Sequence, residues 1–93
     1  MNDGLHTYKF QLFGHVQGVG MRFSIKMRAR KTGLVGAVKN CLDGSVEGII
    51  QGTKIQTEAF FSWLKEKAPG RIDRVLKEKM PSSQSFQTFT IEH

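Results

Sequence analysis

The sequence predicts an α+β fold, a mostly antiparallel sheet with two helices on one of its faces. Three observations predict it. Alternating side chains mark several short strands, apolar residues recurring every three or four positions mark two helices, and turn residues separate these segments. The 93 residues suffice for one modest core. Neither a repeat nor a Pro/Ser-rich linker divides the chain, so residues 1–93 are expected to form a single domain.

Residues 5–14 predict the first strand. The even positions from His6 to Leu12 carry His, Tyr, Phe and Leu, whereas Thr, Lys and Gln take the odd positions between them. Glycines at positions 14, 18 and 20 follow. They predict a loop whose backbone adopts unusual angles or approaches a ligand closely.

The stretch 21–32 fits a strand and also a helix, because its apolar residues alternate and also recur every four positions. Its content of Met, Arg, Lys and Ala favours a helix. Gly33 stands where a glycine commonly ends one. We therefore expect a helix, with Met21, Ile25 and Ala29 spaced four apart along it.

Three more strands and a hairpin are expected further along the chain. The dipeptide Asp43-Gly44 is a hairpin turn signal between strands predicted at residues 35–41 and 45–51. A weaker strand is expected at residues 72–79. A last one is expected around residues 89–91, where apolar and polar side chains alternate.

The second helix is predicted from its two ends. Thr53 and Gln56 have the spacing of a capping box, and Pro69-Gly70 ends the helical pattern. Together the elements give the order βαββαβ, the split-βαβ or ferredoxin-like arrangement. The apolar residues expected on one face of this helix are Ile55, Ala59, Phe60, Trp63 and Leu64.

The charge distribution favours an anionic ligand. The formal net charge is +6, and no acidic residue lies between Asp3 and Asp43. The first half should therefore hold a positive field that attracts anions, although charge does not separate a small phosphorylated molecule from nucleic acid. A solvated basic helix without a specific ligand stays open. The residues expected on a solvated face that helps to draw anions in are Lys26, Arg28, Arg30 and Lys31.

Other patterns exclude several classes of protein. Cys41 is the only cysteine, which rules out an internal disulfide and fits a reducing compartment, so a cytoplasmic location is expected. Its expected role is structural burial. No His/Cys cluster has metal-ligand spacing, so neither a metal nor another cofactor is expected. No apolar run approaches the ~20 residues that span a bilayer, and no secretory signal is visible.

The element order brings two distant segments together. A strand–helix–strand crossover joins parallel strands, and parallel strands end at the same edge of a sheet. The glycine loop is therefore expected beside Asn40, at the end of the second strand. Loop amides and the N-terminal end of the helix dipole can bind an anion, and Arg22 can grip phosphate oxygens bidentately. The combination predicts a nest for a phosphoryl group.

Two motifs resemble those of a known family. Residues 15–22, His-Val-Gln-Gly-Val-Gly-Met-Arg, resemble the acylphosphatase signature Val-Gln-Gly-Val-x-Phe/Met-Arg. Residues 36–40, Gly-Ala-Val-Lys-Asn, followed by Gly44-Ser45-Val46 and Gly52, resemble its second pattern, Gly-aromatic-x-x-Asn-x3-Gly-x-Val-x5-Gly. Ala37 departs from the aromatic residue that the family generally has there.

The resemblance implies hydrolysis of small acyl phosphates to a carboxylate and inorganic phosphate, without metal or organic cofactor. It implies that Arg22 binds the phosphoryl group and that Asn40 positions the attacking water. Phosphate or sulfate would then inhibit, and a monomer is expected. The implied phosphate cradle is the backbone of His15, Val16, Gln17, Gly18, Val19, Gly20 and Met21.

The residues themselves agree with such chemistry. An acyl phosphate has a good leaving group, so catalysis needs mainly positioning and charge stabilisation. Residues 4–42 contain no carboxylate, which suggests that the water's proton passes to the substrate's own phosphate oxygen. For His15, which has no orienting carboxylate in the sequence around it, packing or hydrogen bonding is expected rather than general-base catalysis.

Two other functions stay open. A nucleic-acid-binding domain of the same topology would display aromatic residues on its central strands, but residues 45–50 contain none; no nucleic-acid partner is expected. An acylphosphatase-like module that binds carbamoyl phosphate inside a larger protein, as in hydrogenase maturation proteins, would carry similar motifs. The short chain favours a separate enzyme, and no membrane partner is expected.

Overall fold

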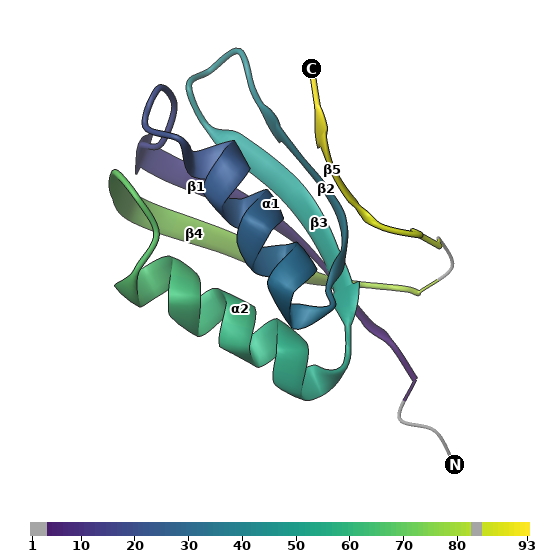
Figure 1. The fold of residues 1–93 in the computed structure, drawn as a ribbon. Helices are drawn as coiled ribbons and strands as arrows, with labels where there is room; N and C mark the ends of the chain where they lie inside the picture. The colour runs from purple at the N-terminus through teal and green to yellow at the C-terminus, as the bar shows by residue number, and fades with distance from the viewer. Residues whose placement is uncertain (1–3, 83–84) are drawn as a thin grey trace.

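The computed structural model describes residues 4–82 and 85–93 (Figure 1). Both helices cover one face of a five-stranded sheet whose strand order is β4-β1-β3-β2-β5. The predicted α+β, ferredoxin-like fold is confirmed, with element ends one or two residues from those expected. The elements are β1 His6–His15, α1 Met21–Thr32, β2 Val35–Asn40, β3 Val46–Gly52, α2 Lys54–Glu66, β4 Arg71–Met80 and β5 Phe89–Glu92.

The register of the central strands places the ends of β1 and β2 side by side. Both strands pair antiparallel with β3, so they run parallel to each other. Leu12 of β1 and Asn40 of β2 lie opposite the same residue, Val46. The expectation that the glycine loop and Asn40 share one edge of the sheet is confirmed. On the outside, β4 pairs antiparallel with β1, and β5 pairs parallel with β2.

The hydrophobic core fills the space between the sheet and the two helices. In α1 the buried residues are Met21, Ile25 and Ala29, as their spacing of four predicts. The largest fully buried side chains contributed by the strands and by α2 are Phe10, Leu12, Val38, Val46, Ile50, Phe60 and Phe89.

The buried face of α2 differs from the predicted one. Its buried residues are Thr57, Phe60 and Leu64, whereas Ile55 is 79% exposed and Ala59 is exposed. Positions 57, 60 and 64 form one stripe at helical spacing, and a residue two positions from Thr57 points about 200° away from it. The prediction was wrong at Ile55 and Ala59 because hydrophobic character was given more weight than this angle.

Ala37, the departure from the family pattern, is buried at 7% exposure. It lies opposite Ile49 in the β2–β3 register. Phe86, from the segment between β4 and β5, lines the same hollow as these two residues.

The far end of the molecule, where α1 stops and α2 starts, is closed by hydrogen bonds. Thr53 and Gln56 form the predicted capping box, with Thr53 N donating to Gln56 Oε1 over 2.8 Å and Gln56 N donating to Thr53 Oγ1 over 3.2 Å. Gln56 Nε2 also donates to Thr32 O over 2.8 Å. Gly33, with φ of 83°, ends α1 as predicted. One side chain therefore ties both helix ends together.

Candidate active site

The loop between β1 and α1 lies at the end of the sheet where β2 also ends (Figure 1). Its glycines adopt positive φ, 76° at Gly18 and 81° at Gly20, and Gly14 just before it has φ of 131°. A side chain at Gly14 would also collide with the backbone carbonyl of Arg71. The prediction of unusual backbone angles at these glycines is confirmed, and the path of the loop depends on them.

The N-terminus of α1 is uncapped. Gly20 is its N-cap residue, no side chain caps it, and its first turn holds no acidic residue. Among the described residues, the amides from Val16 to Phe23 donate to no acceptor of the protein. This end of the helix therefore presents unpaired N–H groups together with the positive end of the helix dipole, the arrangement that binds anions.

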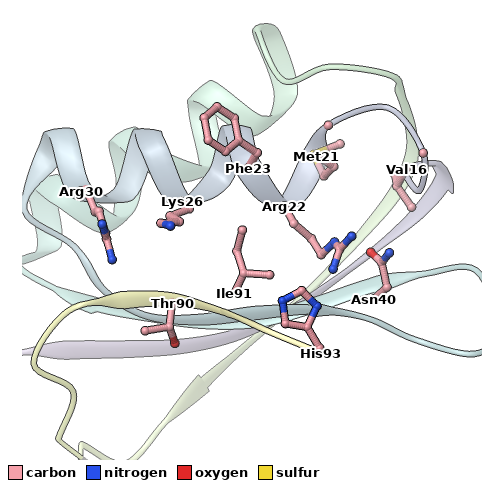
Figure 2. A pocket seen from close by; sticks show the side chains of 12 residues that line it. Val16, Met21, Arg22, Phe23, Lys26, Arg30, Asn40, Thr90, Ile91 and His93 are labelled. Carbon is pink, nitrogen blue, oxygen red and sulfur yellow. The ribbon is translucent and has the colours of Figure 1, made fainter.

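Arg22 and Asn40 line one pocket beside this loop, and Figure 2 shows their side chains next to each other. The Arg22 guanidinium makes no hydrogen bond or ion pair within residues 4–82 and 85–93. Asn40 Oδ1 is buried and has no hydrogen-bond partner there either. Because a buried polar atom without a partner is rare and costly, both groups are available to a ligand.

Gln17 joins the loop to the turn that follows Asn40. Its Nε2 donates to Cys41 O over 2.8 Å and to Ser45 O over 2.9 Å. Cys41 N donates to Ser45 O over 2.8 Å. The two Gln17 bonds therefore meet the hairpin at residues that are themselves hydrogen-bonded to each other. This role of the Gln17 side chain was missed from the sequence, because its partners lie 24 and 28 positions away.

Asp43, the only acidic residue of that turn, forms its hydrogen bonds within the turn. Asp43 Oδ1 accepts hydrogen bonds from Ser45 Oγ over 2.6 Å and from Ser45 N over 2.9 Å. These bonds, the side-chain one above all, hold the pKa of the Asp43 carboxyl below its usual 3.8. Asp43 does not line the pocket of Arg22 and Asn40.

From this corner the pocket extends along α1 towards β5 (Figure 2). Lys26 and Arg30 line it. Together with Arg22 they form a row of basic residues spaced four apart, so each lies one helical turn beyond the one before. Arg30 is exposed, as expected for a solvated face, whereas Lys26 is half-buried. Their spacing of four from Arg22 was the signal that they share its side of the helix. No residue lining this pocket, among those that the structure describes, has a carboxylate side chain.

His93 also lines the pocket and lies near Arg22 and Asn40 in Figure 2. No sequence signal marked it, because its position depends on how β5 docks beside β2.

His15 is the last residue of β1, opposite Arg71, and it is exposed. Cys41 follows the end of β2 and is half-buried, so the expected burial is only partial and the predicted strand end at residue 41 is corrected to Asn40.

The model of the acylphosphatase family matches residues 8–91. The chain belongs to the acylphosphatase family. Proteins named acylphosphatase from Yersinia pseudotuberculosis (strain IP 31758) and Mannheimia succiniciproducens are 39% and 40% identical to it over 84 and 86 residues. These matches cover 88% and 91% of this chain, and 90% and 96% of the two relatives. The family expected from the two motifs is confirmed.

Solved structures of acylphosphatases have the same fold as this chain. The acylphosphatase from Bacillus subtilis is 30% identical with a TM-score of 0.88, covering 96% of this chain and 99% of its own. The one from Coxiella burnetii is 25% identical with a TM-score of 0.87, covering 99% and 100%. Full-length HypF in its phosphate- and nucleotide-bound form is 26% identical with a TM-score of 0.86, covering 96% of this chain but 12% of that protein.

The part of the chain that the structure describes lacks two further features. No group of three or more His, Cys, Asp or Glu side chains is placed to hold a metal ion. No helix of this acylphosphatase-family chain is long and apolar enough to cross a membrane.

Proposed function

We propose that this chain is an acylphosphatase, which hydrolyses the carboxyl–phosphate bond of acyl phosphates to a carboxylate and inorganic phosphate. One observation carries the proposal. Two side chains, Arg22 and Asn40, lie together beside an uncapped helix N-terminus, and the Arg22 guanidinium and Asn40 Oδ1 have no partner among the described residues. Family membership and the relatives named acylphosphatase support the same activity.

The phosphoryl group is held by the backbone amides of residues 15–21 and by Arg22. The unpaired amides at the start of α1 support this role, as does the unpartnered guanidinium, whose planar fork matches two phosphate oxygens. In the transition state, negative charge spreads over the phosphoryl oxygens. Fixed donors aimed at those oxygens stabilise that charge without reorganising.

Asn40 orients the attacking water. Its buried Oδ1, which has no partner among the described residues, can accept a hydrogen bond from that water. The water oxygen bonds to phosphorus as the bond from phosphorus to the acyl oxygen breaks, and the electron pair leaves with the carboxylate. A proton of the water passes to a phosphate oxygen of the substrate, since no Asp or Glu side chain is among the described residues that line the pocket.

No metal or other cofactor is part of the proposed reaction, because Arg22, the amides and the helix dipole meet the phosphoryl charge. A single domain over residues 1–93, a monomer, a cytoplasmic location and inhibition by phosphate or sulfate belong to the same proposal.

Release of phosphate from benzoyl phosphate, measured in the presence of a chelator, tests this function. Wild type should be active and inhibited competitively by inorganic phosphate. Arg22→Ala should lower kcat/KM by roughly 100- to 1,000-fold, the usual loss when one stabilising donor is removed, and Asn40→Ala should lower it by at least about 100-fold because the water is no longer positioned. Arg22→Lys should lose most activity too, because a point charge does not reproduce the bidentate fork.

Two control variants sharpen the assay. Arg28 lies on the same helix but outside the pocket, with its guanidinium 5.9 Å from the Trp63 ring centre, so Arg28→Ala should stay active. His93→Ala tests the proton route, since histidine is the commonest general acid or base near neutral pH. Full activity of Arg22→Ala would overturn the site, and loss of one limb of the pH–rate profile in His93→Ala would overturn the proton route.

A further inference from the structure

The proposed phosphoryl site occupies only one end of its pocket. The remainder runs as a groove between α1 and β5, lined by Lys26 and Arg30 on the helix side and by Thr90 and Ile91 on the strand side (Figure 2). A substrate with its phosphoryl group at Arg22 must also place its acyl part. The groove is the continuation of the pocket that can receive it.

The two cations of the groove differ in what they contact. The Arg30 guanidinium donates to Phe89 O from Nε over 3.2 Å and from Nη2 over 3.0 Å, so it fastens α1 to β5. Lys26 is half-buried, and its ammonium group has no hydrogen bond or ion pair with any residue that the structure describes. Lys26 is therefore a cation without a counter-charge in a partly enclosed groove.

The spacing along the helix sets what could reach both cations. Four residues of α-helix rise about 6 Å, which is the axial offset between Arg22 and Lys26. A four-carbon acyl phosphate that ends in a carboxylate spans roughly 6 Å from phosphorus to the far carboxyl carbon, with bonds of about 1.5 Å. The intervening methylene groups would pass Ile91 and Phe23, which also line the groove.

We propose that Lys26 forms an anion subsite for the acyl part, so that the preferred substrates are monoacyl phosphates of dicarboxylic acids. The proposal rests on the acylphosphatase function above. The second carboxylate pairs with the Lys26 ammonium, while the phosphoryl group stays with Arg22 and the loop amides. Lys26 is then a residue that determines substrate specificity and takes no part in breaking the bond.

Succinyl phosphate and butanoyl phosphate form the test pair, because both acyl groups have four carbons and only the first ends in a carboxylate. The readout is the ratio of their kcat/KM values at about 0.15 M salt, where the Debye length is ≈8 Å and distant charges are screened. Wild type should prefer succinyl phosphate by roughly three- to tenfold, as expected for an ion pair in a half-open groove. Lys26→Gln should bring the ratio to about one, and Lys26→Glu should invert it.

Lys31→Gln is the matched control. Lys31 is exposed on the same helix and does not line the groove, so its substitution removes the same charge elsewhere. It should keep the wild-type ratio. An equal fall of the ratio in Lys31→Gln and Lys26→Gln would overturn the subsite in favour of a general field.

The remaining outcomes separate the two proposals. Equal kcat/KM values for both substrates in wild type would overturn the subsite and leave the acylphosphatase function standing. Failure of folded wild type to release phosphate from benzoyl, succinyl and butanoyl phosphate would overturn the function itself.

Discussion

The two helices of this domain begin in opposite ways. The N-terminus of α2 is closed by the reciprocal bonds of Thr53 and Gln56. The N-terminus of α1 starts at Gly20, has no side-chain cap and leaves its first amides unpaired within the described residues. A cap of the α2 kind is typically worth ~1 kcal/mol. The comparison teaches that α1 forgoes this local stabilisation and leaves its donors free for the anion that we propose binds there.

The same contrast holds for two glutamines that reach across the fold. Gln56 donates to Thr32 O and locks the end of α1 to the start of α2. Gln17 donates to Cys41 O and Ser45 O and fixes the β1–α1 loop against the hairpin, yet Asn40 Oδ1 nearby keeps no partner. The first contact joins two helix ends, and the second fixes the frame around Asn40 Oδ1, a buried atom that has no partner among the described residues.

Giving α1 an acidic N-cap should have the largest effect. Gly20→Asp and Gly20→Asn are a matched pair, because Asp and Asn tolerate the φ of 81° better than most residues and a Cβ there meets no atom within 4 Å. A carboxylate about 4 Å from the phosphoryl group costs roughly 4 kcal/mol at an effective dielectric constant near 20. With benzoyl phosphate, Gly20→Asp should therefore show a kcat/KM at least ~100-fold below that of Gly20→Asn.

Thermal melts of both Gly20 variants should show that each is folded, so that the lower activity of Gly20→Asp is not caused by unfolding. The proposed anion site at this helix end would be contradicted by equal activity in the Asp and Asn variants.

Removing the Gln17 bonds should have an intermediate effect. Without them the loop and the turn after Asn40 move independently, so Gln17→Ala should lower kcat about tenfold while changing KM less, since misplacement by ~1 Å can cost up to 100-fold. Stability should fall by about 1–2 kcal/mol for the two lost bonds. Steady-state kinetics with benzoyl phosphate and thermal melts measure both quantities.

Gln11→Ala is the matched control for Gln17→Ala. Gln11 Nε2 donates to Ser45 Oγ over 2.9 Å, which ties β1 to the same hairpin without contacting the loop. For its one lost bond, this variant should lose about as much free energy of unfolding as Gln17→Ala loses for each of its two bonds, and it should keep the wild-type kcat. A similar fall of kcat in both variants would mean that general loosening of the hairpin, and not the loop contact, sets the position of Asn40.

Removing the cap of α2 should have the smallest effect on catalysis. Thr53→Ala should lower the free energy of unfolding by ~1 kcal/mol, equivalent to about 4–8 °C in Tm for a domain of this size. Its kcat/KM for benzoyl phosphate should stay within about twofold of wild type, because the α2 N-terminus lies at the other end of the molecule. A loss of activity without a change in Tm would show that the two ends are not independent.

The features that the sequence predicted correctly are local or topological. The Thr53–Gln56 box and the Gly33 helix end depend on residues within one helical turn. The meeting of the loop with Asn40 follows from element order alone, because a crossover forces two parallel strands. Residue pattern was therefore sufficient for the fold and for placing the glycine loop beside Asn40.

The features that it did not predict depend on packing between distant segments. The pocket that Lys26 and Arg30 line together with β5 was not predicted, because nothing in α1 itself indicates that β5 lies beside it. The Gln17 bonds cross more than twenty positions. The α2 face was wrong at Ile55, since hydrophobicity does not define a face without the angle at which the helix meets the sheet.

The shared partner of Leu12 and Asn40 has a consequence for how tolerant the site is. Both residues are aligned on Val46, so the middle strand serves as a common reference for the two halves of the site. A displacement of β3 as a whole moves both neighbours together and leaves their separation unchanged. The geometry between loop and asparagine is thereby insulated from strain arriving through the centre of the sheet. The position of the loop relative to Asn40 is sensitive mainly to changes that act on β1 alone or on β2 alone.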